Sequence, residues 1–354
     1  MSSETAETPI IGITVGDLNG IGMEVIIKTL REPGITEMCT PVVFGSSKTA
    51  SYHRKAIDAM DFSFQIIRNV EKKQAHKPNL LNCWEEEVNL DFGTVDKTIG
   101  GYALKSLQAA CQAYEDGHID AMVTAPIHKE SIHSDNFRFS GHTDYLEARY
   151  KSKATMLLIS EEMRMALTTV HIPLAKVTEL LSTELIYEKI KSVHQSLKQD
   201  FLIPKGKIAV LAVNPHAGDA GVMGNEDKEM VEPAIEKACE DGVLAFGPYP
   251  SDSFFGSGNY RKFDAILAMY HDQGLIPFKS LSFGRGVNYS AGLPIVRCSP
   301  DHGTAFEIAG KGIADASSFR EAIYAAIDLV KNRKVDGDIN ANPLKNLKKH
   351  RKDY

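Results

Sequence analysis

Residues 264–310 read DAILAMYHDQGLIPFKSLSFGRGVNYSAGLPIVRCSPDHGTAFEIAG, and we expect the fold to be organised around this stretch. Its apolar run at 265–269 ends abruptly in Tyr270, His271, Asp272 and Gln273. A switch of this kind from apolar to polar residues marks the end of a buried strand. The polar residues that follow are therefore expected at the edge of a sheet.

The second half of the stretch has the composition of an anion site. Lys279, Arg285, Asn288 and Arg297 lie among several glycines, and the polar cluster 301–304 (DHGT) follows them. Cations and amide donors on a glycine-bent backbone suit an anionic ligand, because glycine lets the main chain approach closely. A polar surface loop is the alternative, and this stretch alone leaves both interpretations open.

Composition and charge narrow the class of protein. The 354 residues suffice for one large or two medium α/β domains. A net charge of −6 argues against a general nucleic-acid binder. The five scattered cysteines lack CxxC spacing and fit reduced thiols. Because the chain shows neither a signal-peptide pattern nor an apolar run long enough to span a bilayer, we expect a cytoplasmic protein without a membrane partner.

Apolar β-branched runs alternate with amphipathic helical patterns along the chain. Strands are predicted at 10–15, 41–45, 121–124, 156–159, 165–170 and 208–213, and helices at 23–30, 100–114, 145–150, 183–197, 225–239 and 317–330. Residues 247–252 read as a turn or loop, and residues 331–354 as a basic, solvated tail. The alternation predicts a largely parallel sheet covered by helices on both faces.

Two predicted helix starts are candidate ligand contacts. The first strand stops at the glycine-rich turn 16–22 (GDLNGIG), and a helix follows. Such a corner commonly binds ligands, but the spacing is not GxGxxG and a plain tight turn remains the alternative. His142 and Thr143 precede the helix at 145–150, where Thr143 either caps the helix or contacts a ligand.

Three histidines share one context, because His171, His216 and His271 each follow an apolar predicted strand within a few residues. In open α/β sheets ligands bind outside the carboxyl ends of strands, so we expect the three imidazoles to converge on Zn²⁺ or a similar divalent ion. The alternative is that each histidine bonds a neighbouring loop. Asp252 and Asp272 are further candidates for the same site.

Lys279, Asn288 and Arg297 supply charge and hydrogen bonding for an anionic substrate, with surface ion pairs as the alternative. The chain contains no Walker-type GxxxxGK[ST] and no GxSxG, and no cysteine lies in a comparable strand-end setting. The sequence thus argues against ATP chemistry and against nucleophilic acyl transfer.

Taken in order, these motifs resemble the 4-hydroxythreonine-4-phosphate dehydrogenase family of pyridoxal-phosphate biosynthesis, including its phospho-D-threonate and phospho-D-erythronate dehydrogenase paralogues. The matching pieces, spread over residues 16–312, are GDLNGIGMEV, TAPIHK, SGHTDYLE, TTVHIPL, AVNPHAGDAGVMG, MYHDQGLIPFK, FGRGVN, GLPIVR and DHGTAFEIAG. One departure lies in the first turn, where the family often reads GEPAGIGP and this chain has Leu18, Asn19 and Met23 in place of the two prolines and the alanine.

The resemblance implies an architecture of two α/β/α domains similar to isocitrate and isopropylmalate dehydrogenases. Residues 1–133 and 296–334 would form a cofactor-side domain, residues 134–295 a metal- and substrate-side domain, and residues 335–354 a basic tail. It also implies a homodimer with the active site in a cleft at the subunit interface, and no nucleic-acid partner.

The resemblance further implies roles for named residues. His171, His216 and His271 would bind a divalent metal (Zn, Mg or Co), some of them from the partner subunit. The substrate, a small phosphorylated hydroxy acid, would contact His142, Thr143, Lys279, Asn288 and Arg297. NAD would contact the loop residues Asp301, His302, Gly303, Thr304 and Ala305.

The implied reaction is oxidation of the secondary alcohol of 4-phosphooxy-L-threonine by NAD, followed by loss of CO₂ from the β-keto acid, with the metal as Lewis acid. No general base is identified. The alternatives are oxidation of 4-phospho-D-threonate or 4-phospho-D-erythronate, and a metallohydrolase of a phosphorylated small molecule. The loop at 301–310 favours a dehydrogenase, because a hydrolase would not need it.

Overall fold

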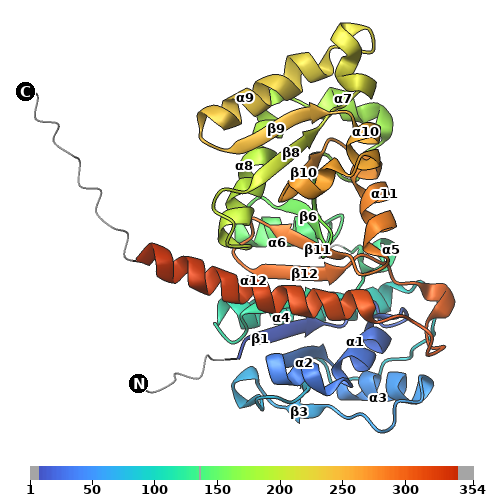
Figure 1. Ribbon diagram of the computed structural model, residues 1–354. Helices are drawn as coiled ribbons and strands as arrows, with labels where there is room; N and C mark the ends of the chain where they lie inside the picture. Colours follow the sequence, from blue (N-terminus) through green and yellow to red (C-terminus); the bar gives the residue numbers. More distant parts are fainter. Residues whose placement is uncertain (1–7, 135–136, 342–354) are drawn as a thin grey trace, which may run out of the picture.

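The computed structural model describes residues 8–134 and 137–341 (Figure 1). In this part the chain forms a 12-stranded sheet in the order β3-β4-β2-β1-β5-β12-β11-β6-β7-β10-β8-β9. The strands are β1 (Ile10–Thr14), β2 (Thr40–Gly45), β3 (Gln65–Ile67), β4 (Asn79–Asn82), β5 (Ala121–Thr124), β6 (Thr155–Ile159), β7 (Arg164–Leu167), β8 (Lys207–Leu211), β9 (Leu244–Tyr249), β10 (Ala265–Ala268), β11 (Val287–Ala291) and β12 (Val296–Pro300).

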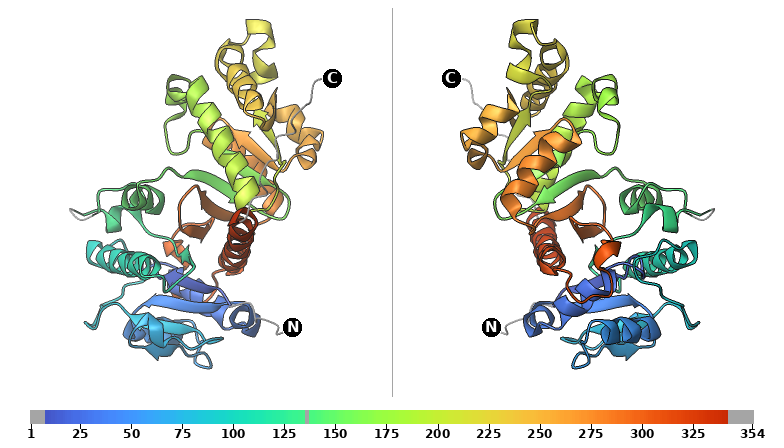
Figure 2. Two further views of the ribbon diagram at one scale, coloured as in Figure 1. Left: turned by 90° about the vertical axis from the view of Figure 1, so that its left-hand side faces the viewer. Right: turned by 90° about the vertical axis from the view of Figure 1, so that its right-hand side faces the viewer.

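Helices lie on both faces of this sheet (Figure 2). They are α1 (Gly22–Leu30), α2 (Pro33–Met38), α3 (Ser47–Ala56), α4 (Lys97–Glu115), α5 (Lys129–Ile132), α6 (His142–Tyr150), α7 (Val177–Leu180), α8 (Thr183–Gln199), α9 (Glu232–Glu240), α10 (Ser251–Gly256), α11 (His271–Ser282) and α12 (Ser317–Ala341). None of the helices in the described ranges is long and apolar enough to cross a bilayer.

Most neighbouring strands pair in parallel. The exceptions are β11, which is antiparallel to both β12 and β6, and the antiparallel pair β6 and β7. Strands β1 to β5 and β12 therefore run one way, and β7, β10, β8 and β9 run the other way. The prediction of a mostly parallel α/β sheet is confirmed. The sheet is continuous through β12, β11 and β6, and the division into two domains stays a prediction.

The two faces of the sheet are packed differently. On one face a single hydrophobic core runs from α1 and α12 to α8 and α9. On the other face there are two separate cores, one beneath α4 and α6 and one beneath α10 and α11. Val296 and Cys298 belong to the continuous core, so the alternation of a strand turns Arg297 toward the other face. The gap between the two cores leaves β12, β11 and β6 open there.

Helix α11 was not predicted, because Gly274 and Pro277 within it are residues that normally interrupt a helix. The helix nevertheless begins at His271, where the apolar run of β10 gives way to polar residues, and it packs on β7. A Cβ at Gly274 would lie 2.6 Å from Cδ2 of Leu167, so the glycine is what permits this close approach.

Two other predictions were wrong. Residues 247–252, expected as a turn or loop, contain the end of β9 and the start of α10, because β9 pairs with β8 despite Gly247 and Pro248. As an edge strand, β9 tolerates these residues. The last helix continues to Ala341 instead of ending at Val330. The rest of the predicted tail lies outside the described residues.

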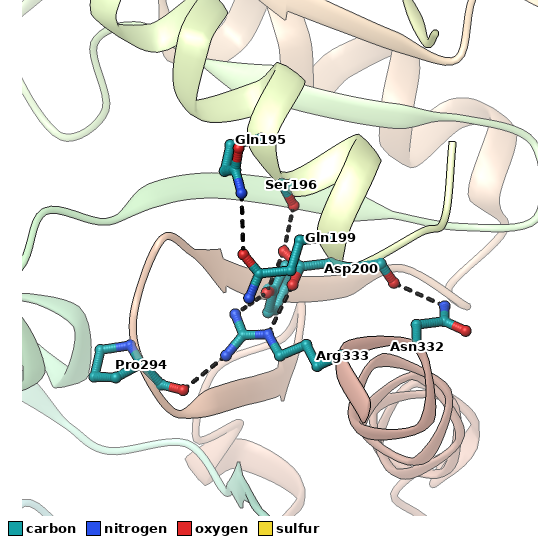
Figure 3. Close-up of polar contacts among 8 residues, drawn as sticks. Gln195, Ser196, Gln199, Asp200, Pro294, Asn332 and Arg333 are labelled. Carbon is teal, nitrogen blue, oxygen red and sulfur yellow. Dashed lines mark hydrogen bonds and ion pairs between the residues drawn. The ribbon is translucent and has the colours of Figure 1, made fainter. Parts of the chain in front are cut away.

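The part of α12 that follows its predicted end at Val330 is held by polar contacts (Figure 3). Arg333 donates from Nε to Oδ1 of Asp200 (2.7 Å) and from Nη1 to the carbonyl of Pro294 (2.7 Å). Asn332 donates to the carbonyl of Asp200 (2.7 Å). These bonds join α12 to the end of α8 and to the turn between β11 and β12.

Candidate functional site

A cavity of about 670 Å³ opens over the central strands, in the gap between the two separate cores. Its floor is formed by Arg297 and Ser299 of β12, Asn288 of β11, and Met156 and Leu158 of β6. The strand register places Asn288 between Ser299 and Leu158, which is why these side chains share one face. The antiparallel middle of the sheet thus provides the floor of the site.

All five predicted substrate residues line this cavity. His142 and Thr143 enter from the start of α6, and Lys279 from α11. Asn288 and Arg297 rise from the floor. The fold therefore brings together residues that are more than a hundred positions apart in the chain.

Arg297 is a buried cation without a carboxylate partner in the described part of the chain. Its side chain is 3% exposed, and it donates from Nε and Nη2 to Oγ1 of Thr124 (3.1 and 2.6 Å) and from Nη1 to Oγ of Ser290 (3.3 Å). Burial lowers the pKa of Arg297 to about 10, so the guanidinium stays charged at neutral pH. A guanidinium has five N–H donors, which leaves donors for an anionic ligand.

The start of α6 adds to this positive potential. Gly141 precedes the helix without a side-chain cap, so the first backbone N–H groups of α6 are available to a ligand. Burial, and secondarily the charge of Arg297, lower the pKa of His142 well below its usual value. His142 is therefore neutral at physiological pH and acts as a hydrogen-bonding group beside the cation.

At the rim, Lys279 connects the floor to the predicted cofactor loop. Its Nζ donates to the carbonyl of Asp301 (3.3 Å). Burial raises the pKa of the Asp301 carboxyl, against the opposing effects of Lys279 and His302. Of the predicted cofactor residues, Asp301, His302 and Gly303 line the cavity, and Thr304 and Ala305 do not.

Thr304 instead contacts the glycine-rich turn at 16–22. The N–H of Ile21 donates to the carbonyl of Thr304 (3.0 Å), and a Cβ at Gly20 would lie 2.9 Å from that oxygen. Two buried ring nitrogens, Nε2 of His302 and Nδ1 of His128, have no hydrogen-bond partner in the described structure, and the ring of His128 lies 5.2 Å from that of Phe306. Orphaned polar atoms beside a cavity suit a polar group such as a nicotinamide cofactor.

His171 and His271 form a pair beside the cavity. They follow β7 and β10, which pair in parallel, and their ring centroids lie 5.6 Å apart. Desolvation, followed by the nearby charges of Lys129 and His271, lowers the pKa of His171. The Nδ1–H of His271 donates to Oδ1 of Asp272 (2.7 Å), which leaves Nε2 of His271 as the ring nitrogen with a free lone pair.

His216 is not grouped with this pair. It is exposed on the loop after β8, at the start of a left-handed run in which residues 216–220 have φ between 44° and 82°. In residues 8–134 and 137–341 no three or more His, Cys, Asp or Glu side chains are placed to hold a metal ion. Asp252 is exposed on α10, outside the cavity. The metal roles of all these residues stay predictions.

Three further residues contribute to the site and were not predicted from the sequence. Thr124, the anchor of Arg297, ends β5, so the strand-end rule applied to the histidines would have found it. Gln273 donates to the carbonyl of Ala212 (2.6 Å) and ties the turn at His271 to the end of β8. Lys189 lines the cavity from the middle of α8, where no sequence pattern marks it.

The chain is similar in sequence to known proteins over most of its length. The model of the family "Pyridoxal phosphate biosynthetic protein PdxA" matches residues 37–326. A 4-hydroxythreonine-4-phosphate dehydrogenase of Bacteroides thetaiotaomicron is 49% identical over 337 residues, which cover 95% of this chain and 92% of that protein. A putative D-threonate 4-phosphate dehydrogenase of Oceanobacillus iheyensis is 37% identical over 329 residues, which cover 92% of this chain and 98% of that protein.

A crystal structure of a 4-hydroxythreonine-4-phosphate dehydrogenase from Klebsiella pneumoniae has the same fold. It superposes with a TM-score of 0.80 at 33% identity, and the match covers 92% of this chain and 99% of that one. The family model, the sequence relatives and this structure all match over most of the chain, which therefore belongs to the PdxA family of pyridoxal phosphate biosynthetic proteins.

Proposed function

We propose that this protein is an NAD- and divalent-metal-dependent dehydrogenase that oxidises the secondary alcohol of 4-phosphooxy-L-threonine in pyridoxal-phosphate biosynthesis, with decarboxylation of the β-keto acid product. The observation that carries the proposal is the buried, carboxylate-free guanidinium of Arg297 on the floor of a cavity that also receives His142, Lys279 and the loop at 301–303. Similarity to relatives that carry this name supports the choice of substrate.

The cavity matches a substrate with two anionic ends. Arg297 and the start of α6 offer a fixed cation and unpaired N–H groups at the floor. Lys279, held by the Asp301 carbonyl, offers a second charge at the rim, near the proposed cofactor loop. Asn288 on the floor supplies an uncharged donor and acceptor. Such an arrangement binds a short, doubly charged molecule in one orientation.

The histidine pair fits a divalent metal ion in its donor chemistry. His171 and His271 supply imidazole nitrogens, and the contact with Asp272 orients the ring of His271. A bound metal ion would supply Lewis-acid stabilisation of negative charge on the substrate oxygen. Since the pair is incomplete as a three-ligand set within one chain, we assign the third position to His216, with histidines contributed by both subunits of a homodimer.

Exposed apolar residues beside these histidines support the homodimer. Leu174, three residues after His171, is 72% exposed, and Val222, in the loop of His216, is 79% exposed. Ile276 on α11, one turn after His271, is 65% exposed. Apolar side chains gathered beside proposed metal ligands favour coverage by a second copy. Sedimentation velocity should show a dimer, and dilution to monomers should release the metal and abolish activity together.

We assign the NAD site to the region where the loop at 301–305 meets the turn at 16–22. The support for this assignment is that Asp301, His302 and Gly303 line the cavity, and that ring nitrogens of His128 and His302 have no hydrogen-bond partner in the described structure. Bound NAD would accept the hydride of the substrate carbon. The protein's own contribution is to hold the cofactor and the substrate alcohol close together in the orientation that the transfer needs. No residue is assigned as general base.

A spectrophotometric assay tests the proposal. NADH formation at 340 nm should follow addition of 4-phosphooxy-L-threonine and stop when a strong chelator is present. The second candidate substrate is 4-phospho-D-threonate, favoured by the relative of Oceanobacillus iheyensis, with 4-phospho-D-erythronate beside it. The substrate with the highest kcat/KM decides among them. If no candidate yields NADH and phosphate is released instead, the protein is a metallohydrolase and the proposal fails.

A further inference from the structure

A further cation reaches the cavity from the opposite face of the sheet. Lys189 belongs to α8, which packs on the continuous core, but its side chain passes the start of β6 and lines the cavity together with Glu147 and Ala154. Its Nζ donates to the carbonyl of Ala154 (3.2 Å) and to Oγ1 of Thr155 (3.4 Å). Both contacts are long and both acceptors are neutral.

The charge of Lys189 has no ion pair in the part of the chain that the structure describes. Glu147, which lines the same cavity, uses Oε1 to accept the N–H of Ala154 (2.6 Å). Desolvation lowers the pKa of Lys189; Glu147 opposes this shift and Lys153 adds to it. A desolvated ammonium on neutral acceptors is a net cost to the folded protein. Such a cost is typical of a group retained for a ligand.

Lys189 and Arg297 bond to neighbouring positions on strands β6 and β11. Oγ of Ser290 accepts from Arg297, and Oγ1 of Thr155 accepts from Lys189. The register of β11 and β6 pairs Ser290 with Met156, the residue next to Thr155. Strand alternation turns Thr155 toward α8, as it does Leu157 and Ile159 of the continuous core. Lys189 therefore reaches the cavity around the start of β6, whereas Arg297 lies on its floor.

We propose that Lys189 is a substrate-binding residue that, together with Arg297, neutralises the phosphoryl group of the phosphorylated hydroxy acid. This inference rests on the proposed function. A phosphate monoester carries a charge of roughly −1.5 to −2 at neutral pH, so one guanidinium leaves it partly uncompensated, and an ammonium on the far side supplies the missing charge. The singly charged carboxylate of the same substrate needs one cation, which Lys279 provides at the rim.

Steady-state kinetics of Lys189→Met test the inference. Loss of one charge-assisted contact should raise KM for 4-phosphooxy-L-threonine about 10- to 100-fold, and kcat should change less than about threefold. Lys189→Arg should bring KM back to within about fivefold of the unmodified protein, because it restores the charge. The matched control is Lys198→Met, which removes an exposed lysine from the same helix and should leave KM unchanged.

Thermal unfolding distinguishes binding from structural support. Because Lys189→Met removes a desolvated charge, its Tm should equal or exceed that of the unmodified protein. An unchanged KM in Lys189→Met overturns the inference. So does a fall in kcat and Tm together that Lys189→Arg does not repair, since that pattern indicates a packing role.

A binding measurement keeps this test independent of the reaction. Calorimetry with inorganic phosphate should show at least tenfold weaker binding to Lys189→Met than to the unmodified protein or to Lys198→Met. If no phosphorylated substrate yields NADH but this difference is present, the proposed function fails and the phosphate site stands. Equal phosphate affinity in the two variants refutes the role of Lys189.

Discussion

Thr124 holds the guanidinium of Arg297 with a single hydroxyl oxygen, which accepts from both Nε (3.1 Å) and Nη2 (2.6 Å). The two residues are on β5 and β12, neighbouring parallel strands of the sheet. A hydroxyl orients the guanidinium and leaves its charge uncompensated, whereas a carboxylate would neutralise it. The contact therefore keeps a buried positive charge available to an anionic substrate.

Thr124→Val should weaken substrate binding and destabilise the protein. Arg297 would lose its closest acceptor while remaining buried, so we expect KM to rise about tenfold and the free energy of unfolding to fall by about 1–2 kcal/mol. Thr14→Val is a matched control, because Thr14 pairs with Thr124 in the register, is 1% exposed, and has an Oγ1 without a hydrogen-bond partner in the described structure. Urea unfolding and steady-state kinetics measure both effects, and equal behaviour of the two variants contradicts the anchoring role.

Metal binding should depend on all three histidines. His216→Ala and His271→Ala should each lose the divalent ion and keep the fold, because both residues are at the surface and outside the cores. His118→Ala, which removes a partly exposed ring lying 3.9 Å from a carboxylate oxygen of Glu71, should keep the metal. Mass spectrometry of metal content and circular dichroism measure these outcomes; a full complement of metal in His216→Ala rules out its role as a ligand.

The pH dependence of metal affinity follows from the same residues. Imidazole binds a metal ion only when neutral, so affinity should fall as the pH drops. Desolvation lowers the pKa of His171, so this ligand stays neutral to a lower pH than an ordinary histidine. A titration with a competing chelator should show release of the metal on acidification, with proton uptake; affinity independent of pH would argue against histidine ligands.

The sequence predicted the alternation of strands and helices, and with it a mostly parallel sheet, because apolar periodicity is a local property. Resemblance of motifs picked five residues that the fold gathers around one cavity, and their role in substrate binding stays a prediction. The sequence did not predict strand β11, which forms part of the cavity floor, because this antiparallel strand depends on pairing with β6 and β12. Helix α11 was hidden by Gly274 and Pro277, and Lys189 by its place in an ordinary amphipathic helix. Tertiary packing decides such features.

Stability should fall on acidification partly through His53. This side chain is 1% exposed and packs edge-on against Phe92, and burial lowers its pKa to about 4 from 6.5. The unfolded chain therefore binds a proton that the folded protein does not, so stability is full above pH 6.5 and declines toward pH 4. The loss from this residue should reach about 3 kcal/mol. His53→Gln should flatten the profile of unfolding free energy against pH in that window, and an unaltered slope contradicts the assignment.

A buried hydrogen-bond network around the carboxylate of Asp200 should contribute strongly to stability. Asp200 is 2% exposed, and its carboxylate accepts from Arg333 (2.7 Å), from Oγ of Ser196 (2.6 Å) and from the hydroxyl of Tyr289 (2.7 Å). Arg333→Met leaves this carboxylate buried without a cation, so the free energy of unfolding should fall by about 3–5 kcal/mol. The exposed neighbour Lys334, paired with Asp120 at 3.4 Å, provides the control, and Lys334→Met should cost less than about 1 kcal/mol.

Kinetics separate this network from the cavity over the central strands. Arg333 and Asp200 line a different cavity, bounded by α8, α12 and the turn between β11 and β12, so KM should be unchanged in Arg333→Met at temperatures where the variant is folded. The double variant Arg333→Met with Asp200→Asn removes both charges and should recover part of the lost stability, because an amide costs less to bury than an unpaired carboxylate. Urea unfolding of the four proteins yields the coupling energy; additive losses would show that the two side chains stabilise α12 independently.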